Sequence, residues 1–591
     1  MHKRLNIGNV VLRINFINYY TMKRFKSLLI LVVAAVFLAG CSGLSKMKKN
    51  SSLVKYDVTP KVLETHAGQV EVSIKGTFPQ KYFDKKTILE ITPVLVYEGG
   101  ETAYKPVKVQ GESVQANNEV ISYNGDSFTY GDKVPYKKEM KKSELVVRIK
   151  ATRGKTVLDF DPVKIADGVI ATSTLVDVHG KPVFMQDKYE RVIPESVMAD
   201  IHYLINQYDL RSTELKAEDI QLLKDYIKKV NEDPNRQFKN VQVSSYASPD
   251  GKLDFNEKLS GQRGTTADKF IKSEFAKIEA AKAGGFFNAT TTAEDWDGFK
   301  AELEKSNVKD KDLILRVLSM YSDPEVRERE IRNMSAAFEV LKTDILPRLR
   351  RSKMSVNVDL VGRSDEEILA QYKADPKALS LEELLRAGSL TTDKNAKLAV
   401  YQTTAQAFPS CIRAHNNIGC CFISLDKADE AIAALEKAKA IDNNDVVKNN
   451  MAVAYLLKGD YTKAEEIYNT MTAATAESKK GLGGLAIMKG QYDAAVNYLT
   501  GEPCFNLALA QVLKGDAARA KITLDGIKEL CKCGKPSYLK AVVGARLDDR
   551  NYAMNGLREA IGFNADWKAY AKTDLELAKY WNDDTFKAAV Q

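Results

Sequence analysis

The chain has 591 residues, of which 44% are hydrophobic and 28% charged. This is an ordinary globular composition, which excludes collagen-like and largely disordered classes. The length exceeds what a single hydrophobic core supports, so three or four domains are expected. The net charge of +9 is modest for this length, and no basic motif interleaved with aromatic residues accompanies it. Nucleic acid is therefore not expected as a partner.

Residues 22–41 have the pattern of a secretory signal, with a basic start and a mostly apolar run over 27–37. The end, Leu38-Ala39-Gly40-Cys41, resembles the bacterial lipoprotein box. The resemblance implies that Cys41 carries the lipid, that 1–40 is a signal peptide and that Met22 is the true start. The apolar run is too short to span a bilayer readily, and an ordinary membrane anchor is the alternative.

The stretch after Cys41 is small, polar and basic, which predicts a flexible lipidated tether over 41–54. No acidic cluster follows Cys41 directly. This favours an outer-membrane lipoprotein that faces the periplasm over one exposed at the cell surface.

Residues 55–175 are predicted to form a β-sandwich. Short runs rich in β-branched residues (70–74, 89–97, 145–149 and 156–160) alternate with clusters of Gly, Pro, Asn and Asp, which is typical of antiparallel strands. The aromatic residues of this range could form a glycan-stacking patch, but core positions are the favoured interpretation. They are Tyr82, Phe83, Tyr97, Tyr104, Tyr123, Phe128 and Tyr130.

Residues 241–270 predict a strand, a polar turn at 247–251 and a helix. On that helix Asn256, Ser260 and Arg263 follow at i, i+4 and i+7, so they share one face. The strand, the turn and the helix would form a small corner, in which the arginine binds an anionic group.

This stretch resembles the central motif of the OmpA-like peptidoglycan-associating family, matching it at Gly251, Asn256, Leu259, Ser260 and Arg263. Residues 205–211 resemble the family's first strand, and 349–360 its closing strand. The resemblance implies an α/β (α+β) OmpA-like domain over 176–365, with a helical insertion at about 276–345. The insertion is read as a lobe packed on the sheet that partly covers the corner.

The resemblance further implies that the peptidoglycan stem peptide binds at Ser248, Asp250, Asn256 and Arg263. Arg263 would pair with the carboxylate of diaminopimelate. Ser248 stands where the family has the Asp that holds the ammonium, and Asp250 is a possible substitute. In the structural alternative, Arg263 only braces the turn as an ion pair.

A linker is predicted over 366–384 and an all-α repeat domain over 385–591. Ala431, Ala464 and Ala495 recur after 33 and 31 residues, and Gly-Asp or Gly-Gln turns separate the predicted helices. The pattern is similar to the tetratricopeptide family, whose solenoids hold a peptide or a partner protein on the concave face. The alternative is a helical spacer.

The sequence contains no G-x-S-x-G, H-E-x-x-H or P-loop motif, so an enzyme, a cofactor and a metal are not expected. A pair of glycosidase carboxylates stays open, because such a pair has no fixed sequence spacing. The six cysteines after Cys41 fall in the repeats and are expected mostly as small buried residues. They are Cys411, Cys420, Cys421, Cys504, Cys531 and Cys533.

Three functions remain open. The first and favoured one is a scaffolding lipoprotein that tethers to peptidoglycan and holds envelope proteins on its repeats. The second is an assembly or chaperone factor for an envelope or secretion complex, without peptidoglycan binding. The third is a surface lipoprotein that binds or processes glycans.

Overall fold

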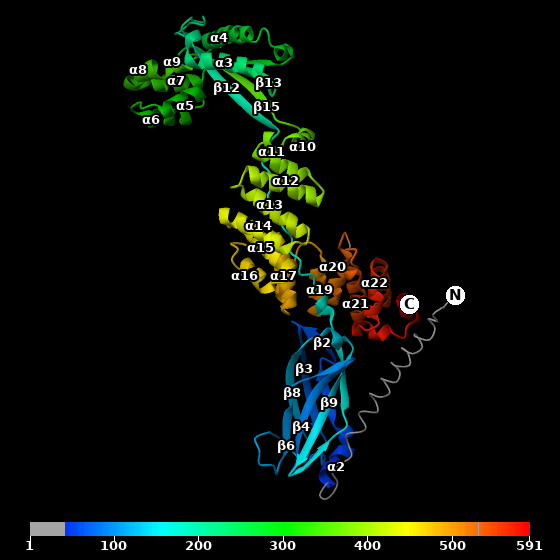
Figure 1. The fold of residues 1–591 in the computed structure, drawn as a ribbon. Helices are drawn as coiled ribbons and strands as arrows, with labels where there is room; N and C mark the ends of the chain where they lie inside the picture. The colour runs from blue at the N-terminus through cyan, green and yellow to red at the C-terminus, as the bar shows by residue number, and fades with distance from the viewer. Residues whose placement is uncertain (1–41, 530) are drawn as a thin grey trace, which may run out of the picture. The chain divides into compact units, whose positions relative to one another are not determined.

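The computed structural model describes residues 42–529 and 531–591, so the predicted signal peptide and Cys41 lie outside the described residues. Two compact units are found. One comprises the chain up to Val183 together with Asn443–Gln591, and the other is Phe184–Asp442. Figure 1 shows the elements of both. Among residues 42–529 and 531–591, none of the helices combines the length and the hydropathy of a membrane-spanning segment.

The first unit begins with a β domain of two packed layers. Its strands are β1 (Lys55–Thr59), β2 (Val62–His66), β3 (Gln69–Phe78), β4 (Ile88–Tyr97), β5 (Gly100–Ala103), β6 (Val107–Gly111), β7 (Glu119–Ile121), β8 (Asp126–Pro135), β9 (Ser143–Arg153), β10 (Thr156–Asp159) and β11 (Val163–Ile170). They run in the order β1-β3-β2-β11-β9-β4-β6-β7, with β8 on β3, β10 on β9 and β5 on β4. The four predicted runs coincide with parts of β3, β4, β9 and β10, except that Phe160 follows the end of β10.

The core of the β domain lies between its layers. Phe78 and Phe128, from β3 and β8, pack with Leu89 and Val147, from β4 and β9. Inward and outward residues alternate along β3 and β9, as a half-buried strand requires. This packing agrees with the predicted sandwich. The core interpretation is confirmed for four of the seven aromatic residues, namely Tyr82, Phe83, Tyr104 and Phe128.

The flexible tether predicted over 41–54 is wrong for its described part. Residues Ser42–Lys49 form the helix α2, followed by the short helix η1 (Ser51–Leu53). Leu44 and Met47 are each only 1% exposed and belong to the core of the β domain. Burying two such side chains contributes several kcal/mol at about 1.5–3 kcal/mol each, so the chain is held on the β domain from Ser42 onward.

The other end of the β domain packs on C-terminal helices of the same unit. The short helix η2 (Lys138–Lys141) brings Lys141 over the ring of Tyr570. In the short helix η3 (Thr172–Leu175), Thr172 Oγ1 donates to Glu576 Oε1 at 2.6 Å. Arg546 bonds to Glu576 as well, and its Nη2 lies 3.7 Å from Glu64. These contacts join the β domain and the C-terminal helices into one unit.

Lys141 is expected to make the protein more stable as the pH rises from about 8 to about 10.5. Burial lowers its pKa from the ordinary value of 10.5 to about 8, so the unfolded chain holds a proton in this window that the folded protein has released. The free energy of unfolding therefore increases with pH there. Urea unfolding across this pH range should show that the free energy of unfolding increases with pH in the wild type and increases less in Lys141→Met. Equal slopes for both proteins would contradict it.

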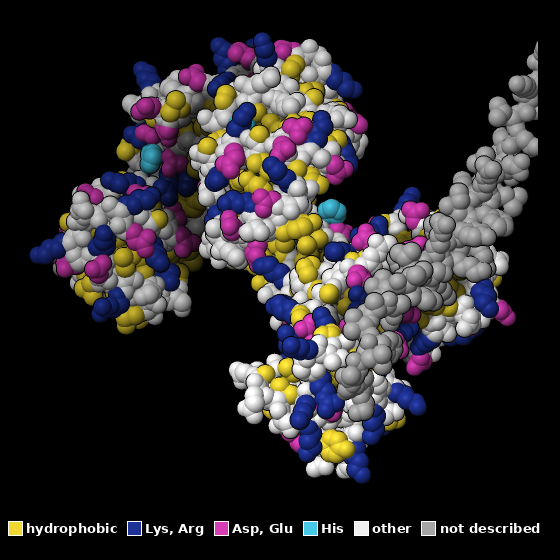
Figure 2. All heavy atoms as spheres, turned by 60° about the horizontal axis from the view of Figure 1, so that its bottom comes forward, with side chains coloured by type: hydrophobic (Ala, Val, Ile, Leu, Met, Phe, Trp, Pro, Cys, Tyr) yellow, Lys and Arg dark blue, Asp and Glu magenta, His cyan; other side chains and the backbone are white. Residues whose placement is uncertain are grey.

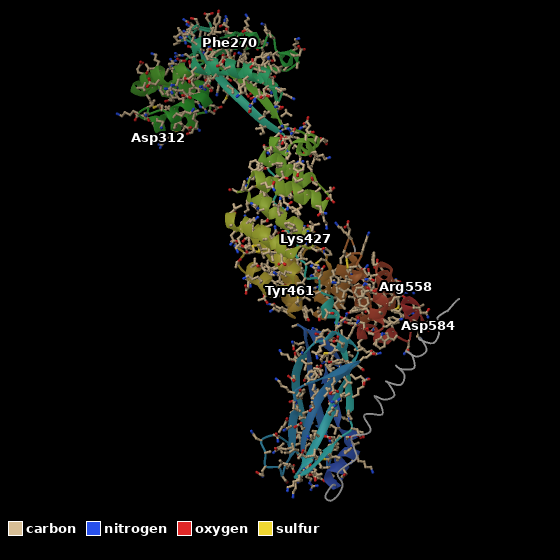
Figure 3. The ribbon with its side chains drawn as sticks, viewed as in Figure 1. Phe270, Asp312, Lys427, Tyr461, Arg558 and Asp584 are labelled. Atoms are coloured by element: carbon tan, nitrogen blue, oxygen red, sulfur yellow. A yellow bond between two sulfur atoms is a disulfide. The ribbon has the colours of Figure 1, made fainter. Side chains whose placement is uncertain are left out.

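The second unit contains a four-stranded sheet of β12 (Val192–His202), β13 (Arg236–Tyr246), β14 (Phe287–Thr292) and β15 (Arg351–Val361). The order is β12-β15-β13-β14, with β14 parallel to β13 and the other pairs antiparallel. The helices α3 (Glu218–Glu232) and α4 (Leu253–Glu274) contribute to one core with the sheet. Phe270 of α4, labelled in Figure 3, is part of that core.

The predicted strand, turn and helix over 241–270 are confirmed as β13, a turn and α4. The closing strand is confirmed as β15. The first strand was predicted at 205–211, but these residues form neither helix nor strand. The strand lies earlier in the chain, as β12. Strand β14 was not predicted, and it falls inside the expected helical insertion. Two shorter helices of this region are η4 (Glu214–Lys216) and η5 (Glu279–Lys282).

The remainder of the insertion is helical. It consists of α5 (Trp296–Lys305), α6 (Lys311–Met320), α7 (Pro324–Asn333), α8 (Ser335–Asp344) and α9 (Leu346–Leu349). These helices share a small core of their own that includes Phe299, Leu303 and Ile345. Arg332 of α7 reaches back to the turn after β13, where Nη2 donates to the carbonyl oxygen of Asp250 at 2.7 Å. The lobe therefore packs on the corner, as expected from the sequence.

Helices make up the rest of both units. The second unit ends with α10 (Asp365–Ala374), η6 (Pro376–Ala378), α11 (Leu381–Leu390), α12 (Lys394–Ala407), α13 (Ile412–Ser424) and α14 (Ala428–Ile441). The first unit contains α15 (Asp445–Lys458), α16 (Tyr461–Tyr468), α17 (Ala476–Met488), α18 (Tyr492–Leu499), α19 (Phe505–Leu513), α20 (Ala517–Asp525), α21 (Lys535–Arg546), α22 (Arg550–Phe563), α23 (Asp566–Ala571), η7 (Leu575–Tyr580) and α24 (Asp584–Val590).

The four predicted helix pairs are confirmed as α13–α14, α15–α16, α17–α18 and α19–α20. Small residues lie where the helices of a pair cross, because a Cβ on Gly419 would lie 2.5 Å from Leu435 and one on Gly483 would overlap Leu499. The linker predicted over 366–384 is wrong: α10 and the start of α11 occupy it, so helical structure begins directly after the sheet.

Candidate functional site

The repeats bind a stretch of their own chain. Residues 176–190, here called the linking segment, lead from η3 to β12 and contain neither helix nor strand. The prediction that 176 already begins the sheet-bearing domain is wrong, because this segment lies along the helices of the repeats. It passes from the first unit to the second between Val183 and Phe184.

In the first unit, two asparagines hold the backbone of the linking segment. Asn450 of α15 accepts from the amide of Val183 at 2.7 Å and donates to its carbonyl at 2.8 Å. Asn506 of α19 accepts from the amide of Asp177 at 3.0 Å and donates to its carbonyl at 2.5 Å. A side-chain amide that bonds both backbone groups of one residue reproduces the pairing of a neighbouring strand.

Further contacts in this unit bring the backbone close to the helices. Asn449 donates to the carbonyl of Lys181 at 3.1 Å. A Cβ on Gly180 would lie 2.5 Å from Val453 of α15, and one on Gly484 of α17 would lie 3.0 Å from the carbonyl oxygen of Asp177. Glycine is therefore needed at both positions because a side chain would not fit. Neither glycine has a positive φ, so backbone conformation is not the reason.

The second unit repeats the arrangement. Asn417 of α13 accepts from the amide of Met185 at 2.8 Å and donates to its carbonyl at 2.9 Å. Glu382 of α11 accepts from the amide of Lys188 at 2.6 Å. The side chain of Asn417 is 1% exposed. If the linking segment dissociated, this buried amide would be left without its hydrogen bonds to Met185.

These asparagines were missed in the sequence, although a signal was present. Asn416-Asn417 and Asn449-Asn450 are adjacent pairs that recur after 33 residues, the spacing that also separates Ala431 from Ala464. Polar pairs that recur with the period of a solenoid and lie inside its helices indicate a ligand-binding face, because a buried amide needs partners.

The corner predicted to bind peptidoglycan is closed by its own hydrogen bonds. Asn256 donates to the carbonyls of Ser248 and Gly251, each at 3.1 Å, and so fixes the turn. The hydroxyl of Ser248 donates to the carboxylate of Asp250. Arg350, which was not predicted as a site residue, forms an ion pair with Asp250 at 3.2 Å. The carboxylate of Asp250 is therefore already engaged.

Arg263 is 0% exposed and bonds to backbone carbonyls. Its guanidinium donates to Gln207 at 3.0 Å, to Tyr246 at 2.9 Å and to Leu204 at 3.3 Å. These bonds fasten the chain after β12 and the end of β13 to α4. Burial lowers the pKa of Arg263 to about 10, and the nearby cation Arg350 adds to the shift. Arg263 braces the corner, as in the structural alternative, although through carbonyls and not through an ion pair.

In the part of the chain that the structure describes, the cysteines and candidate metal ligands form no second site. Cys411, Cys420 and Cys421 are buried thiols, as predicted, and Cys504 is partly buried. Cys531 and Cys533 form a disulfide. Within the described ranges, no group of three or more His, Cys, Asp or Glu residues could hold a metal ion.

Comparison with known proteins identifies the repeat type. A family model described as tetratricopeptide repeat matches residues 412–445, which cover α13 and α14. Residues 412–445 are a tetratricopeptide repeat. The same geometry of crossing helix pairs continues through α15–α20, and we call the helices α11–α22 the tetratricopeptide-like repeats.

Other similarities are distant. BBSome complex member BBS4 from Bos taurus is 28% identical over 123 residues, which span 20% of this chain and only 24% of that protein. A tetratricopeptide repeat protein from Parabacteroides merdae aligns at a TM-score of 0.29 with 15% identity, covering 38% of this chain and 91% of that one. A chain from the crystal structure of the APC/C hetero-tetramer Cut9-Hcn1 aligns at a TM-score of 0.32 with 11% identity, covering 65% of this chain and 61% of that one.

Proposed function

We propose that this protein is a non-enzymatic scaffold that binds other envelope proteins through its tetratricopeptide-like repeats and is anchored by a lipid on Cys41 in the outer membrane, facing the periplasm. The repeats are the observation that carries the scaffold, because such solenoids present long helical surfaces to other proteins. The anchor is supported by the sequence of residues 22–41.

The end of the β domain next to Ser42 supports the anchor as well. It carries the exposed side chains of Lys46 and Lys49 on α2, Lys86 and Lys155. The three segments lie close together, because a Cβ on Gly43 of α2 would lie 2.7 Å from Asp84 and 2.8 Å from Arg153, each two residues before one of the lysines Lys86 and Lys155. In Figure 2, lysine and arginine side chains gather over this end. Among the described residues, none of the four lysines has an acidic partner within salt-bridge distance.

This basic end is expected to bind anionic lipid headgroups without the lipid anchor. Each lysine near such a surface contributes about 1 kcal/mol. The chain from Ser42 should co-sediment with vesicles containing phosphatidylglycerol, less so with phosphatidylcholine alone, and less as salt increases. Replacing Lys46, Lys49, Lys86 and Lys155 by Glu should abolish binding. The same exchange at Lys437, Lys479, Lys480 and Lys528, exposed on the repeats, should weaken it far less; equal losses would contradict a defined docking end.

The anchor itself is tested in cells. Labelling with a clickable palmitate analogue should mark the wild type and not Cys41→Ser, and only the wild type should fractionate with the outer membrane. A labelled Cys41→Ser variant would refute lipidation at this position.

Peptidoglycan binding is proposed as the second activity, on the sequence resemblance over 241–270. The geometry restricts how it works. A stem peptide, which carries both an ammonium and carboxylates, would have to exchange partners with the Arg350–Asp250 ion pair, because Arg263 has no exposed atom.

Asp250→Asn should therefore lower co-sedimentation with purified peptidoglycan by about tenfold or more, since a charge-assisted hydrogen bond is worth about 1.5–3 kcal/mol. Asp312→Asn, on the exposed surface of α6 (Figure 3), is the matched control and should bind like the wild type. If the wild type itself remains in the supernatant, peptidoglycan binding is refuted.

A further inference from the structure

We propose that the peptide ligand of the tetratricopeptide-like repeats is the chain's own linking segment, held through its backbone, and that partner proteins bind to other faces of the helices. This inference narrows the proposed scaffold function and does not depend on the lipid anchor or on peptidoglycan. It differs from the expectation that this face of the repeats awaits a partner's peptide.

The hydrogen bonds follow the period of an extended chain. The residues of the linking segment whose backbone is bound by asparagine are Asp177, Lys181, Val183 and Met185. All four have odd numbers, and in an extended chain every second residue presents its backbone groups to the same side. One edge of the linking segment is therefore paired by side-chain amides, as the edge of a strand is paired by a neighbour.

The side chains of the segment complete the fit. Phe184 packs into the cluster of Leu385, Tyr401 and Ile418, with Lys397 5.3 Å above its ring. Val178 packs on the cluster that contains Leu456 and Leu485. Phe184 and Val178 are sequence neighbours of the bound residues Val183, Met185 and Asp177, so their apolar contacts lower the access of water to these amide pairs. A hydrogen bond in such surroundings is stronger than one in bulk solvent.

Both ends of the linking segment are fixed in folded structure. Leu175 is buried in the core of the C-terminal helices. At the other end, the hydroxyl of Tyr189 donates to the carbonyl of Arg363 at 2.7 Å, and the amide of Gly362 donates to the carbonyl of Arg191 at 2.6 Å. An attached peptide acts at an effective concentration in the millimolar range, so a free peptide of similar affinity cannot compete with it at micromolar concentration.

Hydrogen exchange on the intact chain from Ser42 tests the proposal. The amides of Asp177, Val183 and Met185 should exchange about 100-fold slower than in an unstructured peptide, although no helix or strand protects them. Asn417→Ala with Asn450→Ala should restore fast exchange at Val183 and Met185, while Asp177 stays protected by Asn506. Asn555→Ala, at an exposed asparagine on α22, should change none of the three. Fast exchange in the wild type would overturn the proposal.

A second measurement separates a fixed ligand from a displaceable one. A fluorescent peptide of residues 174–191, at micromolar concentration, should not bind the wild type. It should bind a chain in which 177–189 is replaced by a Gly-Ser stretch of equal length. If the wild type binds the peptide, the linking segment can be displaced by a partner, and the proposal is overturned. This outcome depends on the wild type alone, so it holds even if the Gly-Ser variant does not fold.

Discussion

Arg263→Met is expected to lower the melting temperature of the transition of the sheet-bearing region by about 6–12 °C. The substitution removes three hydrogen bonds that the buried guanidinium donates to partly buried backbone carbonyls, and hydrogen bonds to a charged group contribute about 1.5–3 kcal/mol each. A loss of about 3 kcal/mol shifts the melting temperature by about 2–4 °C per kcal/mol in a region of this size. Scanning calorimetry on the intact chain from Ser42 measures the shift.

Arg558→Met is the control for this prediction, because Arg558 is exposed on α22 (Figure 3) and surface exchanges usually change stability by less than about 0.5 kcal/mol. If Arg263→Met melts like the wild type, the three carbonyl bonds are not what holds the corner together. It follows that a loss of peptidoglycan binding in an Arg263 variant would have two explanations, unfolding of the corner or loss of a contact with the ligand. Such a variant therefore does not test binding by itself.

Gly180→Ala is expected to loosen the linking segment in the first unit. The added Cβ would lie 2.5 Å from Val453 Cγ2 and 3.1 Å from Tyr468 Oη, and both of these side chains are buried. Overpacking of this kind costs about 1–3 kcal/mol. Exchange of the amides over 176–183 should accelerate about 5- to 100-fold, since about 1.4 kcal/mol is a factor of ten.

Gly261→Ala is the matched control, because nothing lies within 4 Å of a Cβ at Gly261 in α4. An alanine in a helix interior is about 1 kcal/mol more favourable than glycine, so this variant should be as stable as the wild type or slightly more so. Unchanged exchange over 176–183 in Gly180→Ala would show that the segment does not lie against α15.

Local patterns predicted most of the elements. The recurring alanines and Gly-Asp turns placed the helix pairs α13–α20, because the close crossing of helices requires small residues at fixed positions. The alternation of apolar residues placed the main strands of the β domain. Strand β14 was not predicted because half of its sequence, Phe287–Thr292, is threonine and most of it is exposed. Its parallel pairing with β13 decides its structure.

Longer-range features could not be predicted from local patterns. The linking segment is extended and has no period of its own beyond a few alternating residues, so its place is set by asparagines that are more than 200 residues away in sequence. Helix α2 looked like a tether, because two buried residues, Leu44 and Met47, are too few to show amphipathic periodicity. Arg263 was correctly singled out, but its role depends on the carbonyls of Leu204 and Gln207, which no motif reveals.

Photo-cross-linking in cells tests most directly whether the repeats hold their own chain. Benzoylphenylalanine in place of Phe184 should cross-link, on irradiation, to residues of α11–α13 in the same molecule, because Phe184 packs against Leu385, Tyr401 and Ile418. Mass spectrometry of the digested adduct identifies the partner. Cross-links within one chain are the predicted result, and adducts to a different protein at this position would contradict the account.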